Sequence, residues 1–215
     1  MRRPRIISFD LDGTLVDKRY VDYLWEELIP KLYAEKYGLE FQDAKRRVRR
    51  EYDLLGPHRI EWYLVDYWLK YFKLDKSKEE LFDEIRHMIK PYSEVKHTLL
   101  ELKRRGYRII IATCAVRDFI NLVMSQIPWL RELVSRVYSS TSDFKLTGKP
   151  KEFYVRITKI EGVKAKDIVH VGDDIEMDYI EPLKAGLKAY LIDRNDKYKH
   201  VKNRIRSLDE LLHLI

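Results

Sequence analysis

Residues 6–15 read IISFDLDGTL. The run over residues 6–9 is largely apolar and predicts a buried strand, and two aspartates follow at its carboxyl end. Asp10 and Asp12 lie two residues apart, so an extended chain places both side chains on one face. In open α/β sheets, ligands bind at this end of the strands. Two such close carboxylates repel each other unless a cation, a shared proton or diverging directions relieve them, and Mg²⁺ suits oxygen ligands.

The rest of the chain alternates short apolar runs with helical patterns. The runs that we interpret as strands cover residues 5–9, 107–113, 136–139, 168–171 and 188–192. Parallel strands need crossover helices, and residue types at Ser93, Pro150 and Gly162 predict where two of these helices begin or end. The pattern predicts an α/β fold with a doubly wound, Rossmann-like parallel sheet.

Residues 17–90 break this alternation. The segment lacks a convincing strand pattern and predicts about four helices, among them a charged helix over 41–55 and an aromatic-rich helix over 58–72. Ser77 and Glu80 fit a capping box at the start of the fourth. We therefore predict a core domain of residues 1–16 and 91–215, with an all-helical domain of residues 17–90 inserted between the first two strands.

Charge alone indicates little about partners. The 215-residue chain carries a net charge of +7 and has a pI near 9.2, which would suit nucleic acid, anionic substrates or simply a well-solvated surface. The densest basic run, residues 45–50, spreads its charge around a helix, so a solvated face is favoured and nucleic acid is not expected as a partner.

The compartment is predicted from cysteine usage and from the absence of long apolar runs. Cys114 is the single cysteine, so an intrachain disulfide is excluded and a reducing compartment is expected. The basic residues 1–5 are followed by too short an apolar run for a signal peptide, and the sequence has no run near the ~20 apolar residues of a membrane span. We expect a cytoplasmic protein with no membrane partner.

Three further segments carry residue types suited to phosphate chemistry. Residues 109–113 (IIIAT) end in Thr113, residues 148–153 (GKPKEF) place Lys149 before a helix, and residues 169–178 (VHVGDDIEMD) end a strand in an acidic cluster. Taken singly, each has an ordinary alternative. A threonine after a strand commonly caps a helix, and a lysine commonly faces solvent, as we expect for Lys145 and Lys151.

Together and in this order, the four segments resemble the signature motifs of the haloacid dehalogenase-like hydrolase superfamily. The first has the DxDGT form, the last has the GDxxxxD form, and residues 207–212 (SLDELL) are also typical. The resemblance spans nearly the whole chain outside the insert. The position and helical pattern of residues 17–90 resemble the first class of cap domain in that superfamily.

The resemblance implies a role for each matching residue. Asp10 would attack phosphorus to form an aspartyl-phosphate, and Asp12 would protonate the leaving oxygen and then activate water. Thr113 and Lys149 would bind the phosphoryl oxygens, with the Leu11 and Cys114 N–H groups as weaker candidates.

The resemblance also implies a bound Mg²⁺. Its ligands would be the Asp10 carboxylate, the backbone carbonyl of Asp12, the Asp173 carboxylate and waters. Asp178 would orient Lys149 or complete the outer metal shell, and Asp174 is the less favoured candidate for that outer position.

Asp12 favours phosphoryl chemistry within the superfamily. The dehalogenases lack this second aspartate, because a leaving halide needs no proton. We therefore predict a phosphatase for a small phosphorylated metabolite, with a phosphomutase or a catalytically silent binding protein as alternatives. Phosphoglycolate, sugar phosphates and nucleoside monophosphates all stay open as substrates, and the sequence indicates no oligomeric state.

The insert offers residues for a substrate pocket, but a structural role is the simpler reading. Its aromatic side chains at helical spacing are expected to form the core of the insert or to pack it onto the main domain. The arginines of residues 46–50 could steer a multiply charged substrate, although we favour a solvated face for them.

Overall fold

The computed structural model describes residues 6–215, so the predictions for residues 1–5, including the start of the first strand at Arg5, lie outside the described chain. One sheet holds six parallel strands in the order β3-β2-β1-β4-β5-β6. The strands are β1 (Ile6–Phe9), β2 (Arg108–Thr113), β3 (Arg136–Ser139), β4 (Ile168–Gly172), β5 (Lys188–Ile192) and β6 (Arg204–Ile205). The predicted α/β class and parallel sheet are confirmed. Strand β6 was not predicted, because a two-residue strand has no period to detect.

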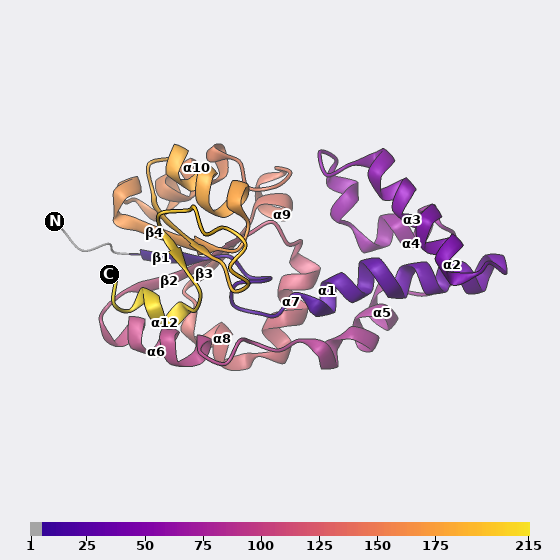
Figure 1. The fold of residues 1–215 in the computed structure, drawn as a ribbon, viewed down its shortest axis with the longest axis horizontal. Helices are drawn as coiled ribbons and strands as arrows, with labels where there is room; N and C mark the ends of the chain where they lie inside the picture. The colour runs from indigo at the N-terminus through magenta and orange to yellow at the C-terminus, as the bar shows by residue number, and fades with distance from the viewer. Residues whose placement is uncertain (1–5) are drawn as a thin grey trace.

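Helices cover both faces of the sheet (Figure 1). One face packs against α6 (Val95–Arg104), α7 (Arg117–Gln126), α8 (Pro128–Leu133) and α12 (Leu208–Leu211). The other packs against α9 (Ser140–Phe144), α10 (Lys151–Glu161) and α11 (Glu181–Lys184). Because both faces are buried, the strands read as nearly continuous apolar runs.

The chain between β1 and β2 is helical throughout its ordered elements, and we call residues 17–90 the insert. Its elements are α1 (Arg19–Tyr23), η1 (Leu24–Leu28), α2 (Ile29–Tyr37), α3 (Phe41–Leu55), η2 (Ile60–Tyr63), α4 (Val65–Tyr71), α5 (Lys78–Ile85) and η3 (Arg86–Met88). The insert lies to one side of the sheet, and both described ends of the chain lie on the opposite side (Figure 1). None of the described helices has the length and apolar character needed to cross a membrane.

Two predictions of helix boundaries were wrong. The expected helix over 58–72 is broken at Leu64, whose backbone is extended. The Trp62 carbonyl accepts a hydrogen bond from the ring N–H of Trp68 at 3.1 Å and not from a backbone N–H of a continuing helix. Ser93 does not cap α6. Glu94 occupies that position, and its carboxylate pairs with Arg194 at 2.7 Å, which ties the start of the helix to the loop after β5.

Other local predictions are confirmed. Ser77 and Glu80 form a capping box at the start of α5, and α10 follows Pro150 and ends at Gly162. Part of the aromatic set of the insert forms its core: Trp68 is 1% exposed, and its ring lies 4.6 Å from that of Tyr52, whereas Tyr71 is 49% exposed.

Candidate active site

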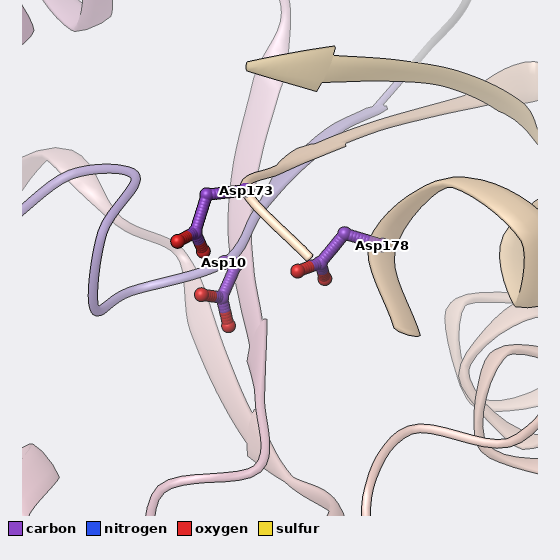
Figure 2. A group of neighbouring side chains, drawn as sticks. All are labelled: Asp10, Asp173 and Asp178. Carbon is purple, nitrogen blue, oxygen red and sulfur yellow. The ribbon is translucent and has the colours of Figure 1, made fainter. Parts of the chain in front are cut away.

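The sheet order brings three carboxylates together. Because β1 lies between β2 and β4, Asp10 at the end of β1 is next to Asp173 at the end of β4, and the Asp10 N–H donates to the Val171 carbonyl at 2.9 Å. Asp178 approaches from η5 (Ile175–Ile180). One oxygen of each of the three carboxylates lies within 4.8 Å of the others, and Figure 2 shows the side chains converging.

Lys149 is the cation of this cluster. Its Nζ lies 2.6 Å from Asp10 Oδ1 and 2.5 Å from Asp178 Oδ1, and the side chain is 1% exposed. Burial alone would lower the lysine pKa, but the charges of Asp10 and Asp178 hold it well above its ordinary value. Lys149 is therefore a buried positive charge, whereas neither Lys145 nor Lys151 pairs with an acid among residues 6–215.

One lysine does not neutralise three acids. Burial raises the pKa of Asp10 well above its ordinary value despite Lys149, and burial with the charge of Asp178 raises the pKa of Asp173 to about 6. Among the residues that the structure describes, no group donates a hydrogen bond to the Asp173 carboxylate. A cation bound between Asp10 and Asp173 would relieve this repulsion, and carboxylate oxygens are ligands that Mg²⁺ prefers, so the donor set fits a magnesium ion.

Asp178 has the opposite electrostatic environment. Burial would raise its pKa, yet the charge of Lys149 and a 2.8 Å contact with His170 Nε2 lower it to about 2. Its ion pair with Lys149 and its place in the acidic cluster are compatible with both roles that the sequence left open. Asp174 points elsewhere: its Oδ1 accepts from the N–H groups of Glu176 and Met177 and caps η5.

Two glycines allow the acids to approach the backbone. Gly13 has φ +85°, and a side chain there would place its Cβ 2.3 Å from Asp173 Oδ2. At Gly172, an added Cβ would lie 2.2 Å from Asp178 Cγ. The glycine in each of the two acidic motifs thus leaves space for an aspartate of the cluster.

Asp12 has a different environment from Asp10, although it is only two residues away. The hydroxyl of Tyr20 donates to Asp12 Oδ1 at 2.6 Å, and Tyr20 is fully buried. Burial raises the pKa of Asp12 to about 6, against the opposing effect of the Tyr20 hydrogen bond. Near neutral pH, Asp12 can therefore exist in the protonated form that an acid catalyst needs.

The phosphate-binding candidates lie at the same edge of the sheet. Thr113 ends β2, is 1% exposed, and its Oγ1 accepts from the Ala115 N–H at 3.2 Å, which leaves the hydroxyl proton free to donate. Within residues 6–215, the Leu11 and Cys114 N–H groups have no protein acceptor. The Cys114 carbonyl accepts from the Thr141 hydroxyl at 2.7 Å, which fixes that peptide.

A family model described as haloacid dehalogenase-like hydrolase matches residues 4–186. The chain belongs to the haloacid dehalogenase-like hydrolases. The predicted superfamily and the prediction of a hydrolytic enzyme are thereby confirmed.

This haloacid dehalogenase-like hydrolase matches some relatives over nearly their whole length and others over a short segment. It is 35% identical over 69 residues to the GMP/IMP nucleotidase YrfG of Escherichia coli, a match over 32% of this chain and 31% of that protein. It therefore spans under a third of that relative. It is 28% identical over 227 residues to the glyceraldehyde 3-phosphate phosphatase of Methanocaldococcus jannaschii, covering 97% and 96% of the two chains. A solved HAD phosphatase from Thermococcus onnurineus shares the fold, with a TM-score of 0.83, 24% identity and coverage of 98% and 97%.

The site of this haloacid dehalogenase-like hydrolase also includes residues that lie outside its motifs or have no assigned role within them. Tyr20, which holds Asp12, lies in the insert and belongs to none of the motifs. His170 lies inside β4, a position typical of a core residue. It is fully buried, but it also bridges Ser8 at 2.9 Å and Asp178 at 2.8 Å. The one sequence feature that could have indicated a role for His170 in the site is its position two residues before Gly172 of the acidic motif.

Proposed function

We propose that the protein is a Mg²⁺-dependent phosphomonoesterase that acts on a small phosphorylated metabolite through an aspartyl-phosphate on Asp10. The observation that carries this proposal is the contrast between Asp10 and Asp12. Asp10 is ion-paired with the buried Lys149, and a cation bound between Asp10 and Asp173 would offset the burial that raises the Asp10 pKa. Asp12 is instead held by the Tyr20 hydroxyl and has a pKa of about 6. One carboxylate suits a nucleophile and its neighbour suits an acid catalyst.

In the first half of the reaction, an Asp10 oxygen forms a bond to phosphorus while the bond from phosphorus to the ester oxygen breaks. Asp12 gives its proton to that oxygen, so the product leaves as an alcohol. In the second half, Asp12 takes a proton from water, the resulting hydroxide attacks phosphorus, and Asp10 and inorganic phosphate are released.

The other residues of the site would stabilise the phosphoryl group. Lys149 offsets the negative charge of the transferring oxygens, and the Thr113 hydroxyl with the Leu11 and Cys114 N–H groups donates to them. Mg²⁺ would be held by Asp10, Asp173 and the Asp12 carbonyl, and it supplies charge neutralisation between nucleophile and phosphate. Asp178 would keep Lys149 in place.

We further propose that residues 17–90 act as a cap over a core of residues 1–16 and 91–215. Two contacts hold the insert against the core. The Tyr63 hydroxyl accepts from the N–H of Gly148, the residue before Lys149, at 3.2 Å, and Lys78 pairs with Asp118 of α7 at 2.8 Å. Closure of such a cap excludes water from the reaction. A reducing, cytoplasmic compartment is part of the proposal, because the single Cys114 is unpaired.

Release of inorganic phosphate from a panel of phosphomonoesters tests the proposal. The panel includes nucleoside monophosphates, phosphoserine and glyceraldehyde 3-phosphate, because relatives bear the names GMP/IMP nucleotidase, phosphoserine phosphatase and glyceraldehyde 3-phosphate phosphatase. Release that requires Mg²⁺ and stops with a chelator is expected. Absence of release from every ester, including an aryl phosphate, by folded protein would contradict the proposal.

Binding of Mg²⁺ should also stabilise the fold. A ligand that binds only the native state at 100 times its Kd adds about 2.7 kcal/mol to the unfolding free energy. We expect Mg²⁺ to raise the melting temperature of the wild-type protein and to have little effect on Asp173→Asn. An equal increase in melting temperature in the two proteins, measured by calorimetry, would show that Mg²⁺ binds at a site without Asp173.

Gly172→Ala should greatly impair activity while the fold survives. The new Cβ would lie 2.2 Å from Asp178 Cγ, so Asp178 must move and Lys149 loses its fixed position. Misplacement of a catalytic group by about 1 Å can cost about 100-fold in rate, and we expect kcat to fall by about that factor. Gly106→Ala is the control: φ is +85° there, but an added Cβ meets nothing within 4 Å, so it should lower stability and leave kcat unchanged. Equal kcat for Gly172→Ala and wild type would show that Asp178 need not be fixed.

A further inference from the structure

The insert contains a cavity of about 220 Å³ between α1, η1, α3 and η2. It is lined by two tryptophans, one tyrosine, three carboxylates and one arginine. None of these side chains has a part in the proposed chemistry. The insert therefore provides a second lined space besides the acidic cluster of the core.

Aromatic contacts connect this cavity to the reaction centre. The ring of Tyr20, whose hydroxyl holds Asp12, lies 6.3 Å from that of Phe119. Asp22 lies in the same helix as Tyr20, and its charge acts on Asp12. The ring of Trp25 lies 6.2 Å from that of Phe119 in α7 of the core. Trp62 precedes Tyr63, whose hydroxyl accepts the hydrogen bond from the residue before Lys149. The cavity is thus on the Asp12 side, where the leaving oxygen departs.

The charge of the cavity lining is negative, although the chain as a whole carries +7. Its one cation, Arg49, lies 2.7 Å from Glu26 and 3.3 Å from Asp53, two carboxylates of the same lining, so the three acids outnumber the single cation. The third acid, Asp22, pairs with Lys18 at 3.7 Å, and both side chains are more than half exposed. Such a pair is weak, so the Asp22 charge stays available to a ligand.

The aromatic side chains of the lining are a second and independent indication that the cavity suits a cationic ligand. The indole rings of Trp25 and Trp62 are both only partly buried and line the cavity. A tryptophan face attracts an organic cation through its π electrons, and a nearby carboxylate adds to that attraction. A carboxylate or a second phosphate on the leaving group would instead meet two tryptophan side chains and net negative charge.

We propose that this cavity receives the leaving group and selects phosphate monoesters of amino alcohols, whose ammonium group lies between Trp25, Trp62 and Asp22. The proposal rests on the proposed function, because it specifies the substrate class of the same site. It excludes esters whose leaving group carries a carboxylate or a further phosphate as preferred substrates.

Three esters of matched size test this selection: phosphoethanolamine, 2-hydroxyethyl phosphate and phosphoglycolate. They differ mainly in carrying an ammonium, a hydroxyl or a carboxylate group at the same position. For the wild-type protein with Mg²⁺, we expect kcat/KM for phosphoethanolamine to exceed that for phosphoglycolate by about 10-fold or more, with the hydroxyl ester between them.

The variant Asp22→Asn keeps the size of the side chain and removes its charge. We expect it to reduce the ratio of kcat/KM between phosphoethanolamine and phosphoglycolate by about 5-fold. The control is Asp43→Asn, which removes an exposed charge of α3 that does not line the cavity. It should leave the ratio unchanged.

Two results would overturn the selection alone: phosphoglycolate hydrolysed as well as phosphoethanolamine, or the same ratio in Asp22→Asn and wild type. Both require a working phosphatase. Absence of hydrolysis of all three esters and of p-nitrophenyl phosphate would instead overturn the proposed function, and the selection with it.

Discussion

Asp10→Asn should reduce phosphate release by more than about 10³-fold, the scale of loss when a covalent nucleophile is removed. The amide has nearly the shape of the carboxylate, but it is a poor nucleophile and carries no charge for Mg²⁺. The fold should persist, because Lys149 keeps its ion pair with Asp178 at 2.5 Å. The substitution also removes one of the mutually repelling acids, so we expect no fall in melting temperature.

The covalent intermediate offers a second measurement of the same prediction. Wild-type enzyme quenched in acid during turnover should yield a phosphorylated peptide that contains Asp10, and Asp10→Asn should yield none. Asp174→Asn is the matched comparison: it makes the same chemical change in the acidic motif, at a residue that caps η5, and should lose less than about 10-fold in rate. Phosphate found on another residue would refute the role of Asp10.

Local sequence patterns predicted most of the core because its strands and helices are marked by short-range patterns of apolar residues. Strands such as residues 136–139 and 188–192 are short apolar runs between helices, and their predicted bounds are those observed. Pairing of β1 with β4 then brings Asp10 beside Asp173. Lys149, selected from three nearby lysines by its motif alone, is the one that the structure buries between two acids.

What the sequence could not supply was the identity of the groups that the side chains contact. Residues 58–72 have a helical pattern, but the bond from the Trp68 ring to the Trp62 carbonyl favours an extended residue between them. The pairing of Ser8 with His170 spans 162 positions. Only packing determines such partners, so no local spacing could have identified His170 as a support for Asp178.

Tyr20 is the clearest case, because it links the insert to the chemistry. It lies at the start of α1, where the chain leaves the core, and its hydroxyl reaches back over eight residues to Asp12. The hydrogen bond fixes the direction of the Asp12 carboxyl group. Any movement of the insert relative to the core would therefore act on Asp12 through Tyr20.

Asp12→Asn should slow the hydrolysis of alkyl phosphates by about 10²–10⁴-fold, the usual contribution of a general acid–base group. The loss should be smaller for p-nitrophenyl phosphate, whose leaving oxygen needs no proton, and that difference identifies the acid role. For the wild-type protein, alkyl ester hydrolysis should fall as pH rises past the Asp12 pKa of about 6, since the carboxyl group then loses its proton.

The control for this prediction is Tyr20→Phe, which keeps Asp12 but removes the hydroxyl that holds it. We expect a smaller loss for alkyl esters than in Asp12→Asn, because the acid is still present but is less well oriented. Loss of the Tyr20 hydrogen bond also removes an effect that lowers the Asp12 pKa, so the fall in rate should move to higher pH. Equal losses for alkyl and aryl esters in Asp12→Asn would mean that Asp12 supports the site without donating a proton.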